Sequence, residues 1–334
     1  MKLVFISVFT VLFLCEKFVP ISSSVIDRSV VYQTCLHKCV YDNCTNEAGN
    51  TFKNYAKPQD IWCKLLRWTC REECSYQCMW FTVQSFKRSG QGVHKLHGKW
   101  PFVRVMGMQE PASVFASVLN FAANIYMYKK IRREFPFSKS LIYKMPIIMF
   151  WHAFAIVCMN AWVWSTIFHM RDTPFTEFMD YACAFSMVMG LFVASVVRLC
   201  HKKPLLTMFL MVVPLFYFVT HVRYLYTGFI NYDYNMSLNI FFGVAGSVVW
   251  LYVSYQQQRS GARHAWRMVA FTLLSGAALS LELFDFPPKY DTWDAHALWH
   301  LSTAPLPLLF FKYVIDDLRY LQSKEPEKFA FKLT

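Results

Sequence analysis

The feature that most constrains this chain is a series of long apolar segments that begins near residue 111 and runs almost to the end. We identify seven of them, at 111–128, 146–168, 175–197, 204–222, 237–255, 268–285 and 295–315. At a rise of about 1.5 Å per residue, each is long enough to cross about 30 Å of hydrocarbon as a helix. The sequence therefore predicts an all-α integral membrane protein, with a seven-transmembrane helix bundle over 109–316.

Composition agrees with a membrane protein. Hydrophobic residues make up 55% of the 334 residues and charged residues only 16%, which is too apolar for a soluble domain. The formal net charge of +13 raises nucleic acid or acidic lipid as alternative partners. Many basic residues cluster beside the apolar segments, however. We therefore attribute the charge to positive-inside topology and expect no nucleic-acid partner.

The distribution of basic residues predicts the orientation of the bundle. Lysine and arginine gather in alternate connections, at 129–144, 198–203 and 259–267, and in the stretch that follows the last segment. The opposite connections carry only Arg171, Arg223 and Lys289. Positive connections stay in the cytosol, so the first, third, fifth and seventh segments are expected to run from lumen to cytosol. This orientation predicts a lumenal amino terminus and a cytosolic tail over 317–334.

The first residues are typical of a signal peptide over 1–24. Lys2 supplies the positive start, residues 3–15 the apolar core, and Ser22, Ser23 and Ser24 a small-residue region for cleavage. An uncleaved first anchor is the alternative, although the apolar core is short for a span. We place the start of the mature chain near Val25.

A cysteine-rich lumenal domain is expected over 25–108. Seven of the eleven cysteines fall here, and several recur at a spacing of four that places them on one face of a helix: Cys35, Cys39, Cys44, Cys63, Cys70, Cys74 and Cys78. Behind a signal peptide this density predicts two short helices joined by disulfides, and the odd number leaves at least one thiol free or paired elsewhere. A zinc cluster is the competing interpretation. Glycosylation sequons occur at Asn43 and Asn235.

Two histidines in the last segment, His296 and His300, lie four residues apart and share one helical face. The predicted topology places three further polar residues at the same depth, near the lumenal surface. Ser165 and His169 end the second segment on one face, and Asp180 lies in the first turns of the third. Ionisable groups at membrane depth are costly, so this coincidence predicts a functional site.

These residue types favour zinc chemistry. Three imidazoles and one open position form a common catalytic zinc site, in which the metal lowers the pKa of bound water to about 7. Asp180 is expected to orient that water or to act as general base, and Ser165 to hydrogen-bond Asp180, the water or a developing oxyanion. A site at this depth suits a substrate with its tails in the bilayer and its head in water.

The other polar and thiol side chains of the bundle are interpreted more simply. We expect isolated histidines to be interface residues and cysteines to be packing residues. Aspartates near the last segment are expected to be solvated loop or interface residues, one of which could support a metal ligand. The residues of these three kinds are His152, His201 and His221; Asp285, Asp291 and Asp294; and Cys158, Cys183 and Cys200.

The pattern Ser165-x3-His169, Asp180 and His296-x3-His300 resembles the signature of the CREST superfamily of seven-span hydrolases and receptors. The stretches 97–102, 109–113, 282–288 and 294–300 are similar to one branch, the post-GPI attachment to proteins factor 3 family. This resemblance implies a Golgi phospholipase of GPI-anchor remodelling, which removes the unsaturated sn-2 acyl chain from GPI-anchored proteins. It also implies that His169, His296 and His300 hold Zn²⁺ beside Asp180 and Ser165.

Two alternatives remain open at this point. One is a ceramidase-like amidase that uses the same site. The other is a non-enzymatic receptor or escort for GPI-anchored proteins in which the metal is structural. The choice of Golgi over endoplasmic reticulum rests on the resemblance alone.

Overall fold

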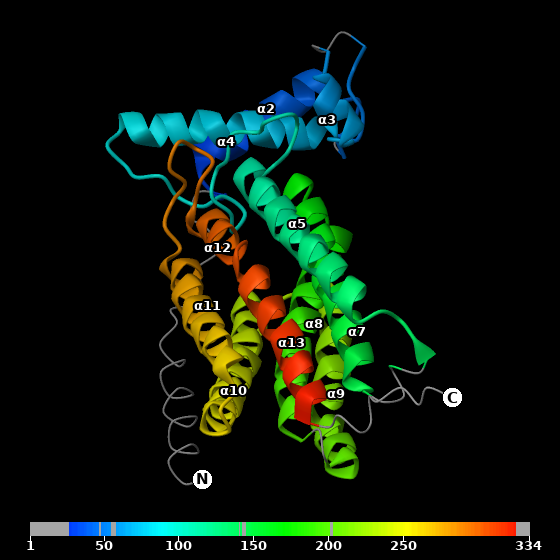
Figure 1. Cartoon of the computed structure of the whole chain (residues 1–334). Helices are drawn as coiled ribbons and strands as arrows, with labels where there is room; N and C mark the ends of the chain where they lie inside the picture. Colours follow the sequence, from blue (N-terminus) through cyan, green and yellow to red (C-terminus); the bar gives the residue numbers. More distant parts are fainter. Residues whose placement is uncertain are drawn as a thin grey trace.

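The computed structural model describes residues 27–46, 48–54, 58–139, 141, 145–200 and 203–324. The expected signal peptide at 1–24, His201 and the end of the expected tail at 325–334 lie outside these residues. Within them the fold is all-α, as predicted, and divides into a cysteine-rich region and a helical bundle (Figure 1).

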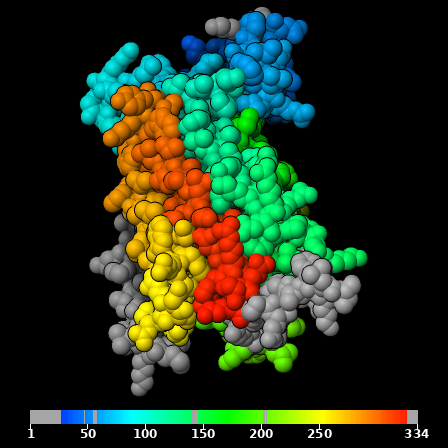
Figure 2. All heavy atoms as spheres, in the orientation of Figure 1, coloured from blue at the N-terminus to red at the C-terminus, as the bar shows by residue number. Residues whose placement is uncertain are grey.

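The cysteine-rich region contains helices α2 (Val30–Asn43), α3 (Ile61–Leu65) and α4 (Cys70–Arg88). The bundle consists of α5 (Pro111–Glu134), α7 (Ile147–Met170), α8 (Pro174–Leu199), α9 (Pro204–Tyr226), α10 (Tyr232–Arg259), α11 (Trp266–Phe284), α12 (Ala295–Thr303) and α13 (Leu306–Lys324), with the short 3-10 helix η2 (Arg263–Ala265) before α11. Helix α4 lies across the end of the bundle at which α5 and α12 begin (Figure 1). The cysteine-rich region thus covers one end of the molecule (Figure 2).

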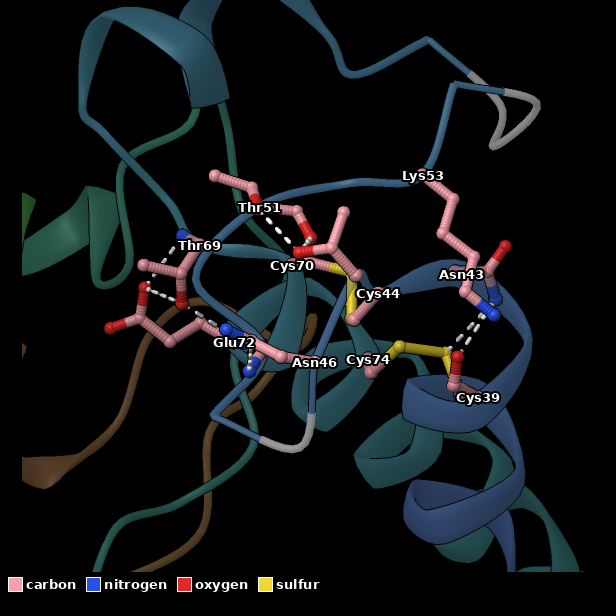
Figure 3. The surroundings of a disulfide bond; sticks show 12 residues. Cys39, Asn43, Cys44, Asn46, Thr51, Lys53, Thr69, Cys70, Glu72 and Cys74 are labelled. Atoms are coloured by element: carbon pink, nitrogen blue, oxygen red, sulfur yellow. Dashed lines mark hydrogen bonds between the residues drawn. A yellow bond between two sulfur atoms is a disulfide. The ribbon is translucent and has the colours of Figure 1, made fainter.

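Three disulfides join α2 and the residue that follows it to α4: Cys35–Cys78, Cys39–Cys74 and Cys44–Cys70. Figure 3 shows two of them beside the capping box of Thr69 and Glu72, which starts α4. The prediction of two helices joined by disulfides is confirmed, and Cys63 is the odd free thiol. The competing zinc cluster is wrong for the six paired cysteines, because disulfides remove the thiolates that such a cluster needs.

Five described helical segments are long and apolar enough to cross a membrane: Ile147–Met170, Pro174–Leu199, Leu205–Tyr226, Tyr232–Arg259 and Arg263–Phe284. The chain is therefore a multi-pass membrane protein. Helix α5 has 24 residues, of which five of the last six are charged, which lowers its mean hydropathy. The full count of seven spans and their orientation stay predictions.

The last expected segment, 295–315, is not one helix. Helix α12 ends at Thr303 and α13 begins at Leu306, with the break at Ala304 and Pro305. Proline lacks the N–H that a continuing helix would use, so Pro305 interrupts the hydrogen bonding even though Ala304 before it keeps helical backbone angles. Helix α13 then continues to Lys324, beyond the expected boundary at 316. The break separates the histidine-bearing turn from the part of the bundle that packs the core.

Large aromatic side chains fill the middle of the bundle. Trp151 of α7, Trp250 of α10 and Phe310 of α13 are almost fully buried, and their ring centroids lie 5.9 to 6.4 Å apart. Gly246 allows α10 to approach α8 closely, since a Cβ there would lie 3.2 Å from the Cα of Phe192 and would press the two helices apart by a few tenths of an ångström. Helix α9, by contrast, exposes most of its apolar residues, as expected for a face that meets lipid.

A buried ion-pair network lies at the end of the bundle opposite the cysteine-rich region. Arg198 of α8 donates two hydrogen bonds to the carboxylate of Asp317 in α13. Gln257 of α10 donates to the same carboxylate at 2.6 Å, and His264 lies 3.2 Å from it. Tyr313 donates to Gln257, so the network joins α8, α10, η2 and α13.

We predict that Asp317→Ala destabilises the protein strongly, because it leaves the Arg198 guanidinium buried without its carboxylate. Removing one partner of a buried pair costs about 3–5 kcal/mol. Thermal unfolding in detergent should show a much larger fall in Tm than for Glu134→Ala, which breaks a pair with Arg319, whose side chain is 51% exposed. The double variant Arg198→Met/Asp317→Leu should recover most of the loss. Equal effects of the two alanine variants would refute a stabilising network.

Candidate metal centre

The three predicted histidines meet where α7 and α12 come together beneath the cysteine-rich region. His169 lies in the last turn of α7, and His296 and His300 lie one turn apart on α12. The Nε2 atom of His296 is 3.4 Å from Nε2 of His169 and 2.8 Å from Nε2 of His300. The ligand atoms of all three lie within 4.8 Å of one another. One metal ion can therefore contact all three rings.

Each imidazole is held at its other nitrogen by a different side chain. The Nδ1 atom of His169 is 2.7 Å from a carboxylate oxygen of Glu110, and Nδ1 of His296 is 2.7 Å from Glu282. Nδ1 of His300 is 3.4 Å from the hydroxyl of Ser117. Such partners fix ring orientation and tautomer in metal sites. When Nδ1 carries the proton toward a carboxylate, the Nε2 lone pair is left for a metal.

The chain positions these residues by capping and pairing helix ends. Asp294 is the N-cap of α12, and its side chain accepts a hydrogen bond from the backbone N–H of Ala297. Asn120 of α5 donates to the carbonyl of His300 at 2.7 Å. The backbone N–H of Glu110 donates to the carbonyl of His169 at 3.0 Å. Carbonyls in the last turn of a helix lack partners within the helix, and this bond satisfies one of them.

A lysine links the centre to the loop above it. Lys99 Nζ is 3.3 Å from Glu110, which binds His169, and 2.5 Å from Asp172. Burial alone would lower the pKa of Lys99, but the carboxylates of Glu110 and Asp172 raise it above its usual value. Burial alone would likewise raise the pKa of Glu110, but Lys99 and His169 hold it below its usual value. Lysine and carboxylate therefore both stay charged.

Ser165 and Asp180 occupy different positions relative to the histidines. The hydroxyl of Ser165 is 3.0 Å from that of Ser117, so Ser165 reaches His300 through Ser117. Asp180 lies half-buried on α8, close enough to His169 and His296 to interact electrostatically. Among the described residues it makes no hydrogen bond to the three histidines. The structure thus brings all five predicted residues to one end of the bundle, with Asp180 separate from the hydrogen-bonded set.

The centre is dry on one side and open on the other. The side chain of His169 is 3% exposed, whereas that of His296 is 32% exposed. Trp162 and Trp299 contact the ring of His300 at centroid distances of 5.3 and 4.9 Å. Aromatic walls lower the local dielectric and strengthen electrostatic interactions. Access to the centre is therefore from the side of His296.

Several expectations about other polar residues are wrong. His152 and His221 are buried within the bundle, where they bond the carbonyl of Phe135 and the side chain of Asn235. Asp294 is buried as the cap of α12 rather than solvated. Both histidines lie near a helix end, His152 in α7 and His221 in α9. A buried imidazole without a hydrogen-bond partner is costly, and each ring has a partner inside the bundle.

The partners Glu110, Glu282 and Ser117 were not predicted as site residues. Glu282 is a carboxylate within the apolar segment 268–285, and ionisable residues at that depth signal a functional site. Glu110 directly precedes the proline that starts α5 and carries no such signal. Ser117 is small and polar, which is common in membrane helices. Only Glu282 was therefore recognisable from the sequence.

The donor set fits a zinc ion. Three imidazoles with one open side match the ligand set of catalytic zinc, and two of the rings have the carboxylate partner typical of zinc-bound histidine.

Comparison with known proteins places this arrangement in a family. The Per1-like family matches residues 60–318. The chain belongs to this family. It is 40% identical over 297 residues to the mouse protein named GPI-specific phospholipase A2-like PGAP3, covering 88% of this chain and 89% of the relative. It is 38% identical to the zebrafish protein of the same name, covering 92% and 94%.

A relative from Drosophila melanogaster carries the other name in use, post-GPI attachment to proteins factor 3. It is 38% identical over 292 residues, covering 86% of this chain and 87% of the relative. The resemblance predicted from the sequence is therefore confirmed. The family match runs from residue 60 to residue 318, so it includes α4 and its cysteines and the bundle as far as residue 318 in α13.

We predict that the purified protein binds one zinc ion per chain and that His169→Ala, His296→Ala and His300→Ala each lose it, because each removes one of three converging donors. Elemental analysis after gel filtration measures the metal content. His221→Ala, which removes a buried histidine outside the centre, is the matched control and should keep the ion. Metal content that is unchanged in all three site variants would refute the assignment.

A second prediction concerns the outer carboxylates. Glu282→Gln keeps the size of the side chain but removes the charge that holds Nδ1 of His296. Loss of such a partner lowers metal affinity about 10- to 100-fold. Competition with a zinc chelator should show this shift. Asp285→Asn, three residues later and paired with Lys95 outside the centre, should leave the affinity within about twofold of the intact chain. Equal affinities for all three proteins would contradict the assigned role of Glu282.

Proposed function

We propose that this protein is a zinc-dependent acyl-ester hydrolase that removes the unsaturated sn-2 acyl chain of GPI anchors. The observation that carries the proposal is the three-histidine centre with its carboxylate partners, at the end of the bundle that the cysteine-rich region covers. The names of the relatives, which describe a GPI-specific phospholipase A2-like protein, supply the substrate class. The reaction consumes water and the ester, and it releases a free fatty acid and a lyso-GPI lipid.

Different residues of the chain would bind the metal, accept the proton and position the ligands in this reaction. His169, His296 and His300 would hold the ion, and a bound zinc supplies Lewis acidity at neutral pH. Asp180 would take a proton from the attacking water, since it is near the rings without being held by them. Ser117 and Ser165 would keep His300 in place through their chain of hydroxyls.

The exposure of His296 supports entry of the ester from that side. Glu282, its partner, also accepts a hydrogen bond from Tyr232 of α10 at 2.7 Å. The three side chains form a line from α12 through α11 to α10, which would fix the exposed ligand while substrate enters. The aromatic side chains that surround the other two rings would keep bulk water away from them.

Two other functions use the same centre. A ceramidase-like amidase would cleave an amide, and an escort would bind GPI-anchored proteins without chemistry. Asp180 favours an enzyme over an escort, because a structural zinc site has no need of a nearby unbound carboxylate. The docked cysteine-rich region favours a substrate with a large head over ceramide. We further propose that this region faces the lumen of the Golgi, in keeping with its disulfides.

The decisive experiment supplies purified protein in lipid nanodiscs with a GPI lipid that carries a labelled unsaturated sn-2 chain. The intact protein should release labelled fatty acid, and Asp180→Asn should lower the rate about 10²- to 10⁴-fold through loss of the general base while keeping its zinc. Asp316→Asn, at the opposite end of the bundle and paired there with Arg267, is the matched control for removing a carboxylate and should keep the full rate.

Mass spectrometry of the products separates the alternatives. Release of fatty acid from ceramide but not from GPI lipid would favour the amidase. Zinc-loaded protein that binds GPI-anchored protein and releases no fatty acid from either substrate would overturn the proposed hydrolase in favour of the escort.

A further inference from the structure

A cavity of about 190 Å³ lies between the cysteine-rich region and the bundle. Its walls come from α4 and the residue before its cap, from the loop over 96–109 and from the loop between α7 and α8. Pockets for drug-sized ligands hold roughly 300–1,000 Å³, so this cavity suits a group the size of one ring. None of the three histidines lines it, so it lies outside the metal centre.

The cavity is connected to the metal centre by one short chain of side chains. Lys99 lines the cavity, its Nζ lies 3.3 Å from Glu110, and Glu110 lies 2.7 Å from Nδ1 of His169. A glycerolipid carries its ester at the edge of the hydrocarbon and its head group farther out. A lipid with its ester at the histidines would therefore place its head group toward the cysteine-rich region, where the cavity lies.

The charges of the lining argue against a bare anion as occupant. The cations Lys99 and Arg104 are accompanied by the carboxylates of Asp172 and Glu72. Lys99 is paired with Asp172, and Glu72 with Arg171. A phosphate would meet both carboxylates, whereas hydroxyl groups can donate to them and accept from the cations. A ring that bears several hydroxyls satisfies both signs.

The lining also offers a fixed aromatic side chain. The indole N–H of Trp100 donates to Asp285 at 3.0 Å, and Lys95 lies over the ring at 5.3 Å. The hydroxyl of Tyr76 accepts from the backbone N–H of Arg104, so its own proton is left to donate. The side-chain oxygen of Gln109 accepts from the backbone N–H of Asp172, and the side-chain nitrogen of Gln109 makes no hydrogen bond within the described residues. Rigid aromatic groups with polar neighbours suit an occupant that is apolar on its faces and polar at its edge.

We infer that this cavity is a head-group subsite that binds a polyhydroxylated ring, an inositol or a hexose, of the lipid whose ester reaches the histidines. The inference rests on the proposed function for the source of the ring, but the cavity and its lining are independent of the metal centre. It assigns the cysteine-rich region a role in substrate selection, because α4 and the residue before its cap supply part of the wall.

The test measures binding of soluble head groups that contain no acyl ester, so that hydrolysis is not involved. Full-length protein in nanodiscs is titrated with glycerophosphoinositol, with glucosaminyl-inositol phosphate, with mannobiose and with glycerophosphocholine. The inference expects saturable binding of at least one of the first three and none of glycerophosphocholine. Preference for the inositol compounds identifies the ring as inositol, and preference for mannobiose identifies it as a hexose.

Three variants locate the binding. Trp100→Leu should weaken affinity about fivefold, in the range of an aromatic contact. Trp100→Phe removes the bond to Asp285 but keeps an aromatic ring, so its affinity should stay within about twofold of that of the intact chain. Trp62→Leu, an exposed tryptophan outside the cavity, should leave affinity unchanged. Absence of binding by the intact chain, or equal affinity for Trp100→Leu and the intact chain, would overturn the subsite. Equal losses in the leucine and phenylalanine variants would also overturn it, since the loss would then come from the bond to Asp285.

The outcome is separable from that of the proposed function. Binding of a hydroxylated ring without fatty-acid release would refute the hydrolase and leave the subsite standing. Fatty-acid release without binding of any of these head groups would refute the subsite and leave the hydrolase standing.

Discussion

Polar groups inside a membrane bundle have to be paired with one another, and this requirement organises the end of the bundle that holds the histidines. Three imidazoles converge there, and each has a second nitrogen that needs a partner. The partners come from the residue before α5, from α5 and from α11. Giving each ring its partner therefore requires four segments of the chain to meet, namely α5 with its cap, α7, α11 and α12. Burial without such partners would cost several kcal/mol per group. The position of α12 depends on these contacts, since it is too short to cross the membrane alone.

The same requirement is met by charge at the other end of the bundle. The carboxylate of Asp317 accepts from Arg198 and Gln257 and lies near His264, and these residues come from four different elements. Between the two polar clusters lies a core of tryptophan and phenylalanine. An aromatic core packs well but does not by itself fix the register of helices surrounded by lipid. We attribute the register to the two clusters, because a shift along the helix axis would leave charged groups unpaired at both ends.

Much of this arrangement could be predicted from the sequence, for physical reasons. Apolar length and basic connections follow from the thickness and polarity of the membrane, so the helical class and the common depth of His169, Asp180 and His296 were within reach. Spacing also predicted the joined helices of the cysteine-rich region. Pro305 lies inside the last expected segment, and a proline within a helical segment signals a break such as the one between α12 and α13. The disulfide pairing, the caps and the outer partners depend on which helices are neighbours, and no single sequence contains that information directly.

The contacts between the two regions argue against a cysteine-rich region that is merely tethered to the bundle. Arg171, the residue after α7, donates to Glu72 of α4 and to the carbonyl of Leu66. Its guanidinium lies 3.9 Å from the centroid of Trp68, and that of Arg104 lies 3.4 Å from the same centroid. Only one residue separates Arg171 from His169. Movement of the cysteine-rich region would therefore act on the end of α7 that carries a metal ligand. The geometry of the metal centre thus depends on how the cysteine-rich region docks. Lys99 and Glu110, which come from the segment between the two regions, contact both the docked region and the centre.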